Sequence, residues 1–130
     1  MIERLIENWL NDVNERGYEG AFCQALVAQG QRIVHRSSHG LMEQGKDVIS
    51  IDRGGVVHAY QLKTGKLDQG SWRQIRDEIV DLVELPINHP NIPVSSPFVP
   101  HLVSNGSITD AVRNDIVMRN QGWRNRGFRL

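Results

Sequence analysis

The chain has 130 residues, of which 39% are hydrophobic, and this size and composition fit a single domain with one core, standing alone or within a longer protein. Fifteen basic residues balance fifteen acidic ones, so the formal net charge of zero excludes a generally basic nucleic-acid binder. Any contact with nucleic acid would therefore come from a local patch, and five arginines between positions 106 and 130 offer one, although a solvated, partly disordered tail explains them equally well.

The N-terminal part of the chain predicts two helices. Apolar residues recur at helical spacing over residues 2–13, and this acidic start lacks the apolar core of a signal peptide. No apolar run approaches the roughly 18 residues of a membrane span, so we expect a cytoplasmic protein without membrane contact. A second helix is expected over residues 18–28, where Cys23, the only cysteine, lies in an apolar pattern typical of a buried free thiol.

A β-hairpin is predicted after a short strand at 31–35 and a polar loop at 37–44. Its strands run from Asp47 to Ile51 and from Val56 to Lys63, and both are rich in Val and Ile. The segment between them, Asp52-Arg53-Gly54-Gly55, has the composition of a tight turn.

The second half of the chain predicts two helices separated by a strand. The first helix runs over 72–84, with Ser71 and Gln74 as a capping-box pair, and all five prolines follow it in an extended connection. A strand at 98–104 and a helix at 107–120 complete the chain. The order of elements predicts an α/β fold with a central mixed β-sheet of about four strands, flanked by helices.

The register of the hairpin follows from its turn. If residues 53–55 form the loop and Asp52 pairs with Val56, then Asp47 lies directly opposite Gln61. Alternate residues share a face, so Lys63 rises beside Gln61 at the end of the strand. The hairpin therefore brings an acid, an amide and an amine to one edge of the sheet.

These groups suit a hard divalent cation such as Mg²⁺, which prefers oxygen ligands. Asp47 would be the main ligand, with the Gln61 side-chain oxygen and the Leu62 carbonyl as further ligands. Glu19 would approach from the second helix. Lys63 would orient or deprotonate a metal-activated water and then stabilise charge on a phosphate.

Simpler interpretations remain open. Ordinary polarity at a strand end explains Asp47, Gln61 and Lys63, and a favourable helix dipole explains Glu19 in a first turn. A second Gln-x-Lys triplet at residues 44–46 lies in a polar loop, so we regard it as a chance match. The five histidines show no spacing typical of a zinc site.

The hairpin pattern resembles the PD-(D/E)xK nuclease superfamily, which has the restriction-endonuclease-like fold. It is most similar to members with Gln in place of the second acid, as in the Mrr-type restriction endonucleases. The resemblance covers most of residues 15–120 and implies that Asp47, Gln61, Lys63 and Glu19 are the catalytic residues. The motif proline is absent because Lys46 precedes Asp47, and the neutral Gln61 implies a metal affinity that depends on substrate phosphates.

The resemblance implies a hydrolase, a Mg²⁺- or Mn²⁺-dependent endonuclease that cleaves DNA phosphodiester bonds, in restriction, defence or DNA processing. Lys66, Arg73 and Gln74 are candidate phosphate contacts. Target choice would come from a homodimer or from an additional specificity domain or subunit. The alternative is a catalytically inactive module of the same fold that binds nucleic acid or a protein partner.

Overall fold

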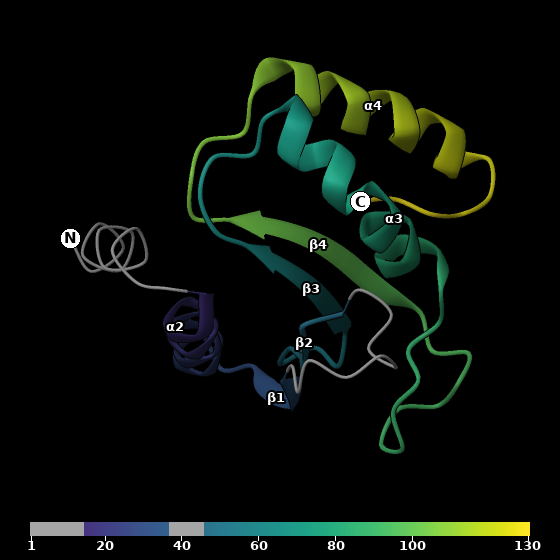
Figure 1. The fold of residues 1–130 in the computed structure, drawn as a ribbon. Coiled ribbons are helices and arrows are strands. Elements are labelled where there is room, and N and C mark those ends of the chain that lie inside the picture. The colour runs from purple at the N-terminus through teal and green to yellow at the C-terminus, as the bar shows by residue number, and fades with distance from the viewer. Residues whose placement is uncertain (1–14, 37–45) are drawn as a thin grey trace.

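The computed structural model describes residues 15–36 and 46–130, which form an α/β fold around one mixed sheet (Figure 1). The sheet has the order β1-β2-β3-β4, with β4 parallel to β3 and the other neighbours antiparallel. This confirms the predicted α/β architecture, whereas the helix expected at 2–13 and the loop at 37–44 lie outside the described residues. The elements are α2 (Glu15–Ala28), β1 (Arg32–Arg36), β2 (Val48–Ile51), β3 (Val57–Lys63), α3 (Gln69–Glu84), β4 (Phe98–Ser104) and α4 (Asp110–Arg124).

The two faces of the sheet are covered by different helices (Figure 1). On one face, Val48, Tyr60 and Leu62 pack against buried residues of α2, including Cys23, which is buried as predicted. On the other face, Ile49 and Ala59 pack against α3 and α4. Neighbouring strand residues therefore enter different cores, which explains why both hairpin strands are apolar at nearly every position.

The predicted hairpin register is confirmed. Ile49 pairs with Ala59, and the same register continues to Ile51 and Val57. The Asp52 carboxylate closes the turn because its Oδ1 accepts the backbone N–H groups of Gly54 (2.9 Å) and Val56 (3.0 Å). One side chain thus supplies acceptors for a turn whose backbone donors would otherwise face solvent.

The predicted start of the third helix is wrong by three residues. Asp68, and not Ser71, is the N-cap, and α3 begins at Gln69. The Asp68 carboxylate accepts the Ser71 N–H at 3.0 Å, while the Ser71 hydroxyl accepts the Asp68 N–H at 2.9 Å. A capping box is therefore present, but Ser71 is its N3 member and Gln74 is free of that role.

Two further boundaries differ from the prediction. Helix α2 begins at Glu15 and continues through Gly17, where a break was expected. Helix α4 begins at Asp110, after the N-cap Thr109, and continues to Arg124. Residues 107–108 do not join this helix because Ile108 forms a bridge with Leu67.

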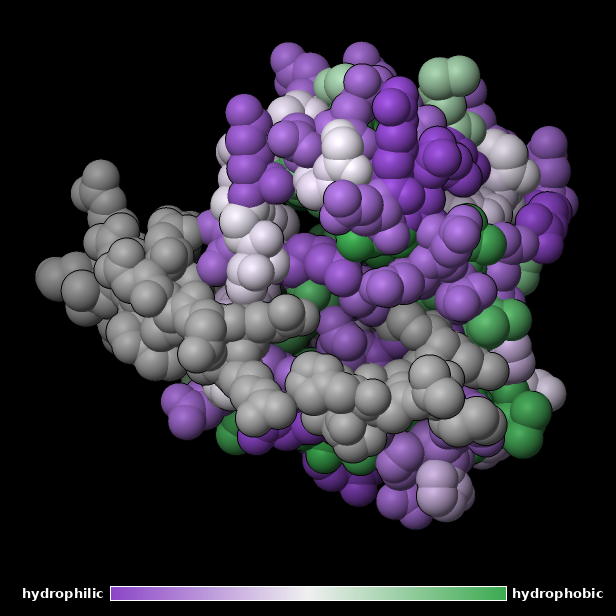
Figure 2. Space-filling model, in the orientation of Figure 1, coloured by the Kyte–Doolittle hydropathy of each residue, from purple (hydrophilic) through white to green (hydrophobic). Residues whose placement is uncertain are grey.

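The C-terminal residues pack on the protein, so a disordered tail is excluded as the explanation of the terminal arginines. Trp123 is buried in the α3/α4 core, and Phe128 and Leu130 pack against the same core. The Leu130 N–H donates to the Asn120 Oδ1 at 2.8 Å, which ties the end of the chain to α4. Hydrophilic side chains gather over α3 and α4 on the face drawn in Figure 2.

The loops that follow β3 and β4 are joined by hydrogen bonds. The Gly65 N–H donates to the Asn105 side chain at 2.7 Å, and the Leu67 N–H donates to the Ser107 carbonyl at 2.8 Å. A Cβ atom at Gly106 would collide with the backbone of Gly65. This close approach fixes the loop directly after Lys63, which carries one of the candidate site residues.

We predict that Gly106→Ala destabilises the protein by about 1–3 kcal/mol, because two backbone segments must separate to admit one methyl group. Gly122→Ala in α4 is the control, since a Cβ there meets no atom within 4 Å and alanine favours a helix by up to about 1 kcal/mol. Urea unfolding of both variants measures the difference. Equal stabilities would show that the two loops are not in close contact.

Two histidines and an aspartate form a chain on the α2 face of the sheet. The His58 Nε2 lies 2.8 Å from the Asp52 Oδ2, and the His58 Nδ1 lies 2.9 Å from the His101 Nε2. The Tyr60 ring stacks on His101. Burial, aided by the charge of His58, holds the pKa of His101 below its usual value of 6.5.

We predict that the free energy of unfolding falls as the pH falls below about 6.5. The unfolded chain then takes up a proton at residue 101 before the folded protein does, so acid favours unfolding, and stability is complete above that pH. His101→Gln keeps a polar group beside His58 and should reduce this loss, as measured by urea unfolding between pH 5 and 7.5. An identical pH profile in wild type and variant would contradict the assignment.

Candidate active site

The predicted aspartate lies at the start of β2, beside the end of β3. The Asp47 N–H donates to the Tyr60 carbonyl at 2.8 Å, and the Asp47 Oδ2 accepts the Leu62 N–H at 2.9 Å. The hairpin register, continued by one residue, places Asp47 opposite Gln61. The carboxylate is thus fixed at the edge of the sheet by the backbone of the Gln-x-Lys strand.

Gln61 and Lys63 converge on a carboxylate that was not among the predicted site residues. The Glu78 Oε2 lies 3.1 Å from the Gln61 Nε2 and 3.1 Å from the Lys63 Nζ. Glu78 lies on α3, and this helix packs on the face of the sheet toward which the Ala59 side chain points. The structure therefore joins the Gln61 amide, the Lys63 amine and the Glu78 carboxylate into one network. Asp47 lies opposite Gln61 on the neighbouring strand.

Gln61 is the buried centre of this network. Gln61 is 4% exposed and its Nε2 donates to Glu78, but its Oε1 is buried and has no hydrogen-bond partner among the described residues. A buried acceptor without a partner costs about 1–3 kcal/mol, so such an atom calls for an explanation. A cation held at this oxygen would supply one.

The charges at the edge also suit a cation. Asp47 and Glu78 each carry one negative charge, Lys63 carries one positive charge, and Gln61 is neutral. The four residues therefore have a formal charge of −1. In the part of the chain that the structure describes, no group of three or more His, Cys, Asp and Glu side chains could hold a metal ion. Two carboxylates and an amide oxygen match Mg²⁺, which usually keeps several waters in addition to one or two carboxylates.

Glu19 is placed differently from the other predicted residues. It is 8% exposed, so it does rise from the inward side of α2, and its ion pair is with Arg36 at 3.6 Å. Helix α2 packs on the face opposite the one from which α3 presents Glu78. Among the described residues, Gln61 and Lys63 bind Glu78, whereas Glu19 binds Arg36. The predicted approach of Glu19 to the Gln-x-Lys strand is therefore not among the contacts of the structure.

The three candidate phosphate contacts do not share one surface. Lys66 is exposed in the loop between β3 and α3. Gln74 lies one helical turn before Glu78, so both occupy the flank of α3 that faces Lys63. Arg73 lies on the other flank, where it lines a groove between α3 and α4.

A further lysine, which was assigned to a chance match, is part of the core. Lys46 is 2% exposed, its Nζ donates to the Asp81 carbonyl at 3.1 Å, and it lies over the Phe98 ring. It therefore anchors the residue before Asp47 to α3. Burial lowers the pKa of Lys46 from 10.5 to about 8, although the charge of Asp81 opposes this shift.

We predict that the protein becomes more stable between about pH 8 and pH 10.5. In this range the folded protein has released the Lys46 proton, whereas the unfolded chain retains it, so rising pH favours folding. Lys46→Met fills a similar volume without titrating and should abolish this rise. Urea unfolding of both proteins across this range is the measurement, and a rise of equal size in the variant would contradict the prediction.

Comparison with known proteins adds no relative: no family model, curated protein or solved structure matches the chain. Within residues 15–36 and 46–130, no helix is long and apolar enough to cross a membrane.

The sequence carries a partial signal for Glu78, although the packing of α3 on the sheet decides which strand it faces. It lies one helical turn after Gln74 and one residue before the buried Ile79, so it borders the apolar stripe of α3. A helix that follows a strand directly and packs back on the sheet runs antiparallel to that strand. Acids on the flank of its apolar stripe therefore lie beside that strand, and Glu78 is such an acid.

Proposed function

We propose that the chain is a Mg²⁺- or Mn²⁺-dependent deoxyribonuclease with a restriction-endonuclease-like core. The observation that carries the proposal is the network at the edge of the sheet. Glu78 holds Gln61 and Lys63 beside Asp47, and the Gln61 Oε1 has no partner in the part of the chain that the structure describes. A binding surface needs no buried amide oxygen of this kind. The resemblance of residues 47–63 to the PD-(D/E)xK pattern is the second support.

Asp47, Glu78 and the Gln61 Oε1 would hold the cation. When bound, the divalent cation supplies positive charge that polarises the scissile phosphate and makes a water molecule more acidic. The Leu62 carbonyl keeps its proposed role as an additional ligand, whereas Glu19, which pairs with Arg36 on the α2 face of the sheet, is assigned none. Glu78 restores the second negative charge that a motif with Gln61 lacks.

Lys63 would act on the phosphate. In the structure its ammonium is neutralised by Glu78 at 3.1 Å. Lys63 is only about a quarter exposed and lies at the end of β3, where its Nζ would donate to a phosphate oxygen and would stabilise the charge that develops during attack by water. The ion pair thus keeps Lys63 ordered at the end of β3 until substrate and cation arrive.

A catalytically inactive module that binds nucleic acid or protein is the alternative. One specific observation favours it: Glu78 already accepts hydrogen bonds from Lys63 and from the Gln61 Nε2, and the Leu62 N–H already donates to an oxygen of Asp47. A self-contained polar network of this kind also stabilises a sheet edge without any catalysis.

Cleavage of DNA by designed variants tests the proposal. Asp47→Asn keeps an acceptor oxygen for the Leu62 N–H, and Glu78→Gln keeps the shape of its side chain, so both remove charge with little change in packing. We expect each of them, and Lys63→Met, to reduce Mg²⁺- or Mn²⁺-dependent cleavage by at least about 100-fold. Linear, supercoiled, single-stranded and branched DNA are compared in a gel assay, with and without metal.

Asp77→Asn is the matched control, because Asp77 is the exposed neighbour of Glu78 on α3. It should cut like the wild type. Calorimetric titration with Mg²⁺ or Mn²⁺ gives a readout besides activity, and binding should weaken in Asp47→Asn and Glu78→Gln. Folded variants that cut like the wild type, or a wild type that cuts none of the four DNA forms, would overturn the nuclease assignment in favour of the inactive module.

A further inference from the structure

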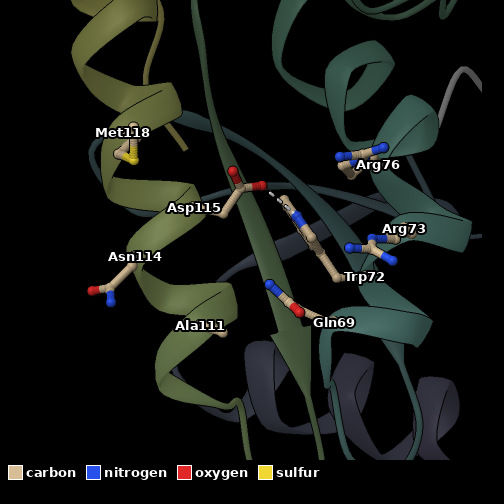
Figure 3. Close-up of a pocket in the computed structure, with 8 residues that line it drawn as sticks. All are labelled: Gln69, Trp72, Arg73, Arg76, Ala111, Asn114, Asp115 and Met118. Atoms are coloured by element: carbon tan, nitrogen blue, oxygen red, sulfur yellow. Dashed lines mark hydrogen bonds between the residues drawn. The ribbon is translucent and has the colours of Figure 1, made fainter.

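A polar groove separates α3 from α4 on the side of the helices away from the sheet (Figure 3). Its cavity volume is about 220 Å³. Trp72 and Asp115 meet at its centre, where the Trp72 indole N–H donates to the Asp115 Oδ2 at 2.5 Å. Because Trp72 is 2% exposed, this bond joins the core to the floor of the groove.

The carboxylate in the floor is already compensated. The Arg119 Nε lies 3.1 Å from the Asp115 Oδ2, so one guanidinium and one indole N–H share a single oxygen. The hydrogen bond from Trp72, followed by the bond and charge of Arg119, lowers the pKa of Asp115 below its usual value. Asp115 therefore remains ionised and its charge is offset within the protein.

The rim of the groove carries cations that face solvent. Arg73 and Arg76 lie three residues apart on α3, on the same flank of the helix, and both line the groove. Within the described ranges, neither arginine forms an ion pair with a carboxylate at hydrogen-bond distance. The side-chain amides of Gln69 and Asn114 lie nearby and add uncharged donors.

These features describe a place for an anion. Two guanidinium groups one helical turn apart can donate to the same phosphate, and charge-assisted bonds of this type are stronger than neutral ones. With Asp115 offset by Arg119, the two rim arginines exceed the charge of the exposed Asp77, one helical turn after Arg73, and leave a local charge of +1 on a chain whose net charge is zero. The cationic surface is therefore local.

We propose that this groove binds a backbone phosphate of DNA, away from the bond that is cut. The inference rests on the proposed function, because DNA is its substrate. Gln69 and Arg73 belong to the first part of α3, the helix whose other flank presents Glu78 to Lys63. Helix α3 would therefore contact DNA on both flanks, with the catalytic edge on one and the phosphate groove on the other.

The test is DNA binding without cleavage. Fluorescence anisotropy of a labelled duplex is measured in EDTA over a series of salt concentrations, for wild type and for Arg73→Gln/Arg76→Gln. The double variant should bind about tenfold more weakly, and the slope of log affinity against log salt should fall by about 0.9, the value for one lost phosphate contact. Arg124→Gln/Arg129→Gln carries the same change of charge away from the groove and is the control.

Several outcomes would overturn the inference: no binding of duplex by the wild type, an unchanged salt slope in Arg73→Gln/Arg76→Gln, or an equal loss in the control variant. Inorganic phosphate distinguishes the source of the anion. The fluorescence of Trp72, measured as the difference between wild type and Trp72→Phe, reports phosphate at the groove. If phosphate changes this signal at concentrations that do not weaken duplex binding, the groove binds free phosphate and not DNA.

The two proposals fail separately. A wild type that cuts DNA together with an Arg73→Gln/Arg76→Gln variant that binds normally would remove the groove and keep the nuclease. A wild type that cuts nothing but binds duplex through Arg73 and Arg76 would remove the nuclease and keep the groove.

Discussion

The pairing of β2 with β3 in a single register is the constraint on which the rest of the structure depends. It is set by the turn that the Asp52 carboxylate closes, and it decides which residues face α2 and which face α3. A shift by one residue would move Gln61 to the α2 core and Leu62 to the polar edge. Burial of an unpaired amide and exposure of a large apolar side chain both oppose that shift, so the site and the core specify the same register.

The hairpin was predictable because local chemistry determines it. The Asp-Arg-Gly-Gly segment defines the turn, and the turn defines every pair up to Asp47 and Gln61. The strand at Phe98–Ser104 was also predicted with its observed bounds, since prolines precede it and Asn105-Gly106 follows it. Helix starts were less predictable because several polar residues near each start can act as the cap. Asp68 and Ser71 are both residues of this kind, and the structure shows Asp68 as the N-cap and Ser71 as its N3 partner.

The candidate site was predicted only where it lies on the hairpin. Asp47, Gln61 and Lys63 are related by a ladder whose geometry is known in advance. Glu78 depends on how α3 crosses the sheet, and Glu19 depends on how α2 approaches from the other face. Lys46 was misread for the same reason. Its triplet is polar in sequence, but α3 covers it, and the Asp81 carbonyl and the Phe98 ring replace water around its ammonium. Helix packing on a sheet is decided by the whole core and not by local pattern.

The residues of the candidate site come from one continuous segment, the β2–β3 hairpin and the helix that follows it. The hydrogen bonds from Gln61 and Lys63 to Glu78, and from Leu62 to Asp47, each join residues fewer than twenty positions apart. Closure of such short loops costs little chain entropy, whereas α4 and the C-terminal residues must return over a much longer distance. The hydrogen bonds of the candidate site therefore join residues of short sequence separation, and they can form before the last helix docks.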